Sequence, residues 1–370
     1  MSSILMDASK QWASRPGDER YTSLTDMQAF FTTQREQSRA MAFPSRKIRV
    51  IPSDDNEGLT IADGSAGDSA TQFAPTHWAF GQLAQRAEAP AGYLRTLASP
   101  LAADCINYGL HVKRDVEDVG LLLQKNGSNI ARAVTGPNYG RIWNSDIVKQ
   151  LIAKFGDGIT GRFRVPGEFG VKVDVTKANT TLYAGDRDMF VFLADEVNRI
   201  EVPGRRNGEP GQMARGFFVW NSEVGSATFG IKTFLFDYVC MNRIVWGAMD
   251  VKCLTIRHTA SAPTRWADEL VPALQDYANS SAANVVQAIE KAKQARIGKT
   301  SEDVVDFLAK RFSKRLATQF TEIHMAEEGR PIETLWDAAT AVTAKARSVQ
   351  WQDERVAMEE QGGALIDLAK

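Results

Sequence analysis

The chain has 370 residues, which is long enough to bury a sizeable core in one large domain or two smaller ones. Its 44 basic and 45 acidic side chains nearly cancel, so the net charge of −1 gives no sign of a generic nucleic-acid binder, while leaving room for a local basic stripe. The absence of a long apolar run, of a secretory signal pattern and of a paired set of cysteines argues against a membrane span and a disulfide scaffold, and predicts a cytoplasmic protein.

Residues 1–60 are polar and predict an N-terminal arm. Within it, residues 23–37 predict an amphipathic helix that is capped by Ser23 or Thr25, and residues 48–52 predict a short strand. One face of the helix carries Leu24, Met27, Phe30 and Phe31. A loop rich in Gly, Ser and Asp at 61–70 separates the arm from the body. The arm either covers its own protomer or tethers a second subunit.

Residues 61–260 predict an α+β core domain. Helical patterns between 76 and 110 are broken by two prolines, and the following segments alternate with period two, as strands do, around one helix at 144–155. Residues 261–370 predict a helical region. The fold class expected is therefore α+β, with an antiparallel sheet core flanked by N-terminal and C-terminal helices.

A continuous helix is expected over residues 301–320, with an apolar stripe on one face. Opposite that stripe the spacing gathers four basic residues, namely Lys310, Arg311, Lys314 and Arg315. They form either a solvated helix face or a stripe that tracks phosphates. A second basic feature, Arg205 and Arg206, lies in a glycine-rich segment that reads as a hairpin tip.

Motifs for nucleotide or metal chemistry are weak. The segment 156–161 matches G-x-G-x-x-G, but it follows a helix and precedes a strand, which favours a glycine turn at a helix end. The triplet 298–300 resembles the end of a P-loop without its first glycine or its strand. The four histidines have no partners at metal-ligand spacing. We therefore expect no metal site, no cofactor and no assignable catalytic residue.

The segment 215–258 is the densest in aromatic and β-branched residues, and polar residues that are costly to bury are threaded through it. Those polar and glycine positions are Asn221, Ser222, Gly225, Asn242, Arg243, Arg257 and His258. Four blocks, at 77–97, 132–148, 186–190 and 221–259, stand in an order that resembles the family called phage/plasmid-like protein, a domain of unknown function (number nine-three-two). The signature residues either form a structural polar network or contact a ligand.

The resemblance implies carriage by phages, prophages or plasmids, whose proteins often serve DNA metabolism. With an Arg-bearing hairpin and a basic helix face, the chain is expected to bind single-stranded DNA or anneal strands in recombination or replication, without being an enzyme. The phosphates would contact Arg205, Arg206 and the four basic helix residues, while bases would stack on Phe217 or Trp220. A homo-oligomer is expected.

Two alternatives stay open. The first is an interaction protein that counters a host defence or remodels a host complex through a host protein partner. The second is an enzyme acting on nucleotides or nucleic acid through a spatial cluster of Asp237, Arg257 and His258.

Overall fold

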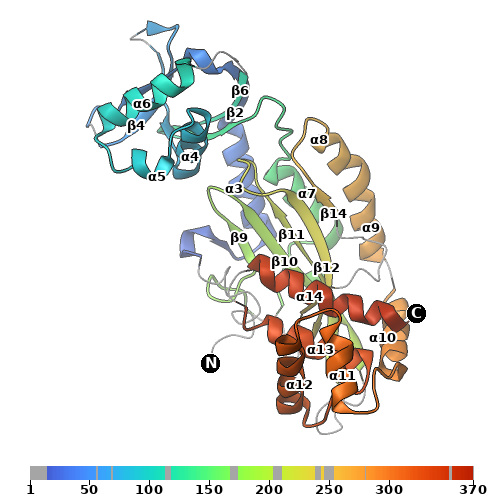
Figure 1. The fold of residues 1–370 in the computed structure, drawn as a ribbon. Helices are drawn as coiled ribbons and strands as arrows, with labels where there is room; N and C mark the ends of the chain where they lie inside the picture. The colour runs from blue at the N-terminus through green and yellow to red at the C-terminus, as the bar shows by residue number, and fades with distance from the viewer. Residues whose placement is uncertain are drawn as a thin grey trace.

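The computed structural model describes residues 15–55, 57–67, 70–112, 118–166, 174–202, 211–237, 243–245, 254–279, 281–349 and 352–369. These residues form a smaller lobe and a larger lobe (Figure 1). The chain passes between them after the end of helix α3 (Leu24–Glu36) and before the start of helix α7 (Asn144–Phe155). A large antiparallel sheet and helices toward both ends of the chain confirm the predicted α+β class.

The larger lobe is built on an eight-stranded antiparallel sheet in the order β1-β9-β10-β11-β12-β13, with β14 paired to β12 and β8 to β10. Its long central strands are β10 (Met189–Val202), β11 (Gly211–Asn221) and β12 (Phe229–Asp237). The shorter strands are β1 (Arg20–Tyr21), β8 (Phe163–Arg164), β9 (Leu182–Ala184), β13 (Arg243–Val245) and β14 (Leu254–Ile256).

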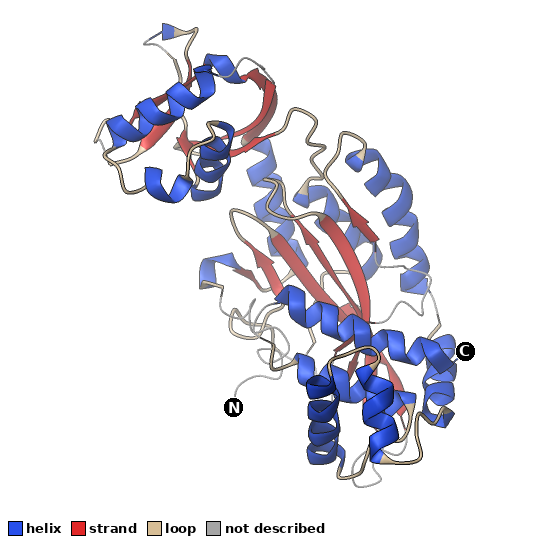
Figure 2. Ribbon diagram, viewed as in Figure 1, coloured by secondary structure: helices blue, strands red, loops and turns tan. Residues whose placement is uncertain are grey.

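Both faces of this sheet are covered, as the near-continuous apolar composition of its strands requires. Because side chains alternate along a strand, Val191 and Leu193 point to one face and Phe190 and Phe192 to the other. The first face packs against helices α3 (Leu24–Glu36), α7 (Asn144–Phe155) and α9 (Val271–Asn279). Helix α14 (Gln352–Ile366) crosses the second face (Figure 2).

Helix α8 (Ala262–Arg265) runs into α9 through one π-helical turn. The helices that follow form a helical layer next to α14, namely α10 (Ala283–Gln294), α11 (Ser301–Ala309), α12 (Lys314–Glu328) and α13 (Leu335–Ala346). The continuous helix expected over 301–320 is wrong. The hydroxyl of Ser313 accepts a hydrogen bond from the Leu316 amide at 3.2 Å and starts a new helix there, because serine is a favoured N-cap.

The smaller lobe holds a four-stranded sheet in the order β2-β6-β7-β5 and the hairpin β3-β4. The strands are β2 (Ser38–Pro44), β5 (Ala74–Pro75), β6 (Asp118–Lys125), β7 (Asn129–Thr135), β3 (Ile48–Pro52) and β4 (Leu59–Asp63). Helices α4 (His77–Arg86), α5 (Ala91–Leu94) and α6 (Ser99–Val112) share a core with this sheet and the hairpin.

The predicted arm, as far as it is described, contributes to both lobes. Ser23 caps α3 by accepting a hydrogen bond from the Asp26 amide at 3.0 Å, and Leu24, Met27 and Phe31 are buried, which confirms the predicted helix. Phe30, which was expected on the same face, is exposed. Strand β1 joins the larger sheet, whereas β2 follows α3 directly and joins the smaller one. The predicted strand at 48–52 is β3.

Candidate functional site

The four sequence blocks that carry the family resemblance meet at the junction of the two lobes. The loop 222–227, which follows β11, inserts Val224 between residues of the smaller lobe. The Val224 carbonyl accepts hydrogen bonds from Trp78 Nε1 at 3.1 Å and from Gln82 Nε2 at 2.7 Å, both on α4. The carbonyl of Arg187, from the third block, accepts the Ser222 hydroxyl at 2.6 Å.

Glu223 is the charged centre of this junction. One carboxylate oxygen accepts a hydrogen bond from the backbone N–H of Asn144 at 2.8 Å, and the other lies 3.0 Å from Nη1 of Arg132. Both charged side chains are buried. Since α7 has no side-chain cap of its own, Glu223 supplies from a distant loop the negative charge that a helix N-terminus favours. Arg141 adds a hydrogen bond from its Nε to the Glu223 carbonyl at 2.8 Å.

The neighbouring signature residues shape the loop. The side-chain Nδ2 of Asn221 donates to the Ile142 carbonyl at 2.9 Å and to Asn144 Oδ1 at 2.7 Å. The Ser222 hydroxyl accepts the Ser226 amide at 2.9 Å. Gly225 has a φ of +84°, a left-handed conformation that glycine adopts without steric cost. These contacts favour the structural interpretation of the polar signature residues over a ligand-contacting one.

His258 closes the junction from the end of β14. Its ring stacks on Tyr139 with 4.8 Å between centroids, and Nδ1 lies 3.0 Å from the Gly140 carbonyl. Burial lowers the pKa of His258, with the Gly140 contact opposing that effect. Arg257, next to it, is exposed. Asn242 lies outside the described residues, and for Arg243 the structure describes the backbone, which pairs with Phe236.

The cluster proposed for an enzyme is not assembled. Ile256, just before Arg257 and His258, pairs with Phe229 at the start of β12. Asp237 ends that nine-residue strand, so its backbone lies about 26 Å away at 3.3 Å per residue. Among the described residues no group of three or more His, Cys, Asp or Glu side chains is placed to hold a metal ion.

The described residues that were expected to bind nucleic acid do not lie together. Lys310, Arg311, Lys314 and Arg315 are all exposed, but they surround the turn between α11 and α12, at the end of the larger lobe away from the smaller one (Figure 1). Arg205 and Arg206 lie outside the described residues.

The two aromatic residues expected to stack on bases lie in the larger sheet. Phe217 is fully buried, and its ring centroid lies 4.5 Å from that of Phe155, so it offers no surface to a base. Trp220 is partly buried beside Phe218, and Lys232 Nζ lies 5.9 Å from its ring centroid.

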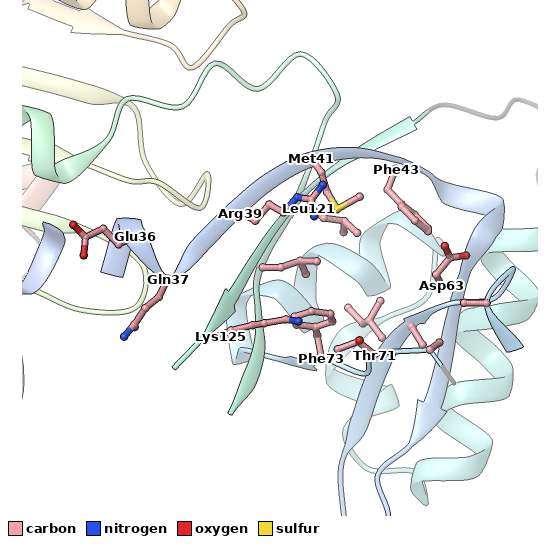
Figure 3. Close-up of a pocket in the computed structure, with 15 residues that line it drawn as sticks. Glu36, Gln37, Arg39, Met41, Phe43, Asp63, Thr71, Phe73, Leu121 and Lys125 are labelled. Atoms are coloured by element: carbon pink, nitrogen blue, oxygen red, sulfur yellow. The ribbon is translucent and has the colours of Figure 1, made fainter. Parts of the chain in front are cut away.

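A groove of about 690 Å³ in the smaller lobe was not foreseen from the sequence. Its floor is the face of β2 and β6 that carries Met41, Phe43, Leu121 and Leu123, and Phe73 closes it from the segment before β5 (Figure 3). The register pairs Met41 with Leu121 and Arg39 with Leu123, which places alternate residues of both strands on this one face.

Charged groups stand at the rim of this groove. Arg39 and Lys125 are exposed on neighbouring strands, and Lys125 Nζ lies 5.8 Å from the Phe73 ring centroid. Asp63 lies near Phe43 on another side (Figure 3). Hydrogen bonds from the hydroxyl and then the amide of Ser65 lower the pKa of Asp63, so its carboxylate is charged at neutral pH. The groove therefore combines an apolar floor with two cations, Arg39 and Lys125, and two carboxylates, Glu36 and Asp63.

No local pattern predicts this groove, because its lining residues come from segments 36–43, 61–66, 70–73 and 121–125, which only the fold brings together. The alternation of Arg39, Met41 and Phe43 was the available signal.

No protein-family model, curated protein or solved structure matches the chain, so the family resemblance stays a prediction. No helix in the described part of the chain has the length and apolar character needed to cross a membrane.

Proposed function

We propose that the protein binds single-stranded DNA non-enzymatically, with bases held in the groove of the smaller lobe. The observation that supports this most is the pairing of partly exposed apolar side chains, Met41 and Phe43, with the cations Arg39 and Lys125 at the rim. Single-strand binders use aromatic surfaces on which bases stack and cations that follow the phosphates.

The size and shape of the groove favour single strands over duplex. Its volume of about 690 Å³ is within the range of pockets that enclose small molecules, and a duplex cannot enter without unstacking its bases. Four exposed basic residues at the α11–α12 turn offer a second place where phosphates can bind. In this proposal the protein serves strand annealing in the recombination or replication of a mobile element, as the family resemblance suggests.

Replacing Phe43 with Ala tests the stacking contact. Loss of one base–aromatic contact costs about 1–3 kcal/mol, so F43A should bind a labelled oligonucleotide about 5- to 150-fold more weakly. Phe30 on α3 is 37 % exposed and lies outside the groove, so F30A is the matched control and should bind normally. Equal affinities for F43A and F30A would remove the groove from the site.

The cations are tested separately. Each neutralised phosphate on a single strand contributes about 0.7 to the slope of log K against log salt, so Arg39→Ser with Lys125→Ser should lower that slope by about 1.4. Lys149 and Lys291 are also exposed and do not line the groove. A double variant at those two positions removes the same charge and should leave the slope unchanged. A fall of the same size in both double variants would mean that net charge, and not the groove, determines binding.

A second candidate function, binding of a host protein, is favoured by four exposed apolar residues on α5 and α6. Tyr93, Leu101, Tyr108 and Val112 are 52–71 % exposed. Large exposed apolar surfaces mark interaction sites on soluble proteins. Under this candidate, Tyr108→Ser would abolish a salt-insensitive complex with a purified host protein and leave oligonucleotide binding unaltered.

A further inference from the structure

Strand β2 lies at an edge of the smaller sheet, and its outer edge meets no other strand among the described residues. It is seven residues long, and Ala40 and Ala42 are exposed. A long edge strand is a template for pairing with another chain, and proteins usually block it with charges, proline or a bulge. Here one charge, Arg39, and one proline, Pro44, stand toward the two ends of the strand and leave its centre open.

The inner hydrogen bonds of β2 show which groups face outward. Just before β2, the Lys125 amide donates to the Gln37 carbonyl at 3.0 Å, so residue 37 faces β6. Hydrogen-bonding direction alternates along an antiparallel strand, so residues 39, 41 and 43 also bond to β6. The amides and carbonyls of Ala40 and Ala42 therefore point away from the sheet, and their methyl groups leave room for a neighbouring backbone.

Two copies of this edge complement each other under two-fold symmetry. An antiparallel pair centred on Met41 places Ala40 opposite Ala42 of the second copy, so both outward-facing residues exchange hydrogen bonds. In the same register Arg39 lies opposite Phe43 of the second copy. The two Arg39 residues are then about 13 Å apart along the strand, so no like charges oppose each other.

We propose that the protein forms a homodimer in which β2 pairs with β2 of a second copy and joins the two smaller sheets into one. Arg39, Met41 and Phe43 share the groove face of the strand, so the second copy extends each groove with its own Phe43 and Met41. The dimer depends on the strand edge alone. The use of the joined grooves as one continuous track for a single strand rests on the proposed DNA binding.

Ala42→Pro is the first test, measured by sedimentation velocity of the full chain without DNA. Proline removes the outward amide of residue 42 and leaves the bonds from β2 to β6 in place, since proline is tolerated on edge strands. The wild type should sediment as a dimer and A42P as a folded monomer, while Ala42→Ser, which keeps the amide, should remain a dimer. A monomeric wild type, or an A42P dimer of unchanged affinity, overturns the proposal.

Met41→Cys tests the register. At the two-fold axis residue 41 faces its own copy in a non-hydrogen-bonded pair, where Cα atoms lie about 4.5 Å apart, within the range that a disulfide spans. M41C should form a crosslinked dimer under mild oxidation, in excess of any that the wild-type cysteines give. Ala40→Cys should not crosslink, because residue 40 faces residue 42. Crosslinking of A40C in place of M41C overturns the register and the joined groove.

Discussion

Removing the carboxylate of Glu223 should destabilise the junction of the two lobes. In Glu223→Ala the guanidinium of Arg132, which is 4 % exposed, loses the carboxylate 3.0 Å from its Nη1. The backbone N–H of Asn144 at the start of α7 loses its acceptor at the same time. Breaking a buried ion pair by removing one partner costs about 3–5 kcal/mol, because the remaining charge stays buried without compensation.

The measurement is urea unfolding followed by tryptophan fluorescence, because Trp78 and Trp143 both pack at this junction. Glu269→Ala is the matched control, since it removes one carboxylate from an exposed pair with Arg265. Because both partners of that pair are exposed to solvent, it contributes little to stability. The double variant Arg132→Met with Glu223→Leu should be more stable than E223A, because it leaves neither charge buried alone. An E223A chain no less stable than E269A would refute the assignment of Glu223 as the centre of the junction.

Three further outcomes follow from the same structure. Gly140→Ala should lower the melting temperature strongly, because a Cβ there would lie 1.9 Å from the Thr259 carbonyl, whereas Gly17→Ala meets nothing within 4 Å; equal melting temperatures would contradict this contact. Phe217→Ala should cost about 3–5 kcal/mol in urea unfolding and leave oligonucleotide affinity unchanged, and weaker binding by the folded variant would return Phe217 to the site. Burial lowers the pKa of His258 from 6.5, so the unfolded chain takes up this proton first and stability falls as the pH drops below about 6.5. In a series of melting temperatures against pH, His258→Gln should remove part of that fall, and identical profiles would contradict the effect.

Helix starts and ends were predicted correctly where the residues that determine them lie within a few positions of each other. Ser23 begins α3 as expected, and Gly156 ends α7 with a φ of +86°, which confirms the predicted glycine turn at the end of a helix. The prediction from apolar periodicity failed at Ser313. There an apolar stripe with helical spacing continues across a serine cap, and periodicity alone does not reveal the break.

The site could be predicted from the sequence in part. Asn221 stood out as a polar residue among aromatic ones, whereas Glu223 was not singled out. Their partners, Asn144 and Arg132, are about eighty to ninety residues away and belong to another block. Phe217 was expected to stack on bases because its burial is not visible in the local sequence. That burial depends on helices that pack from both ends of the chain. The groove depends on strand pairing between β2 and β6, which no local pattern specifies.

The central claim is that the groove of the smaller lobe binds single-stranded DNA, and fluorescence anisotropy with labelled single-stranded and duplex oligonucleotides over a salt series tests it most directly. The account predicts binding of the single strand in preference to the duplex, weakening with salt, and reduced about 5- to 150-fold by Phe43→Ala but not by Phe30→Ala. Absence of single-strand binding at low salt, or equal binding by the two variants, would contradict it.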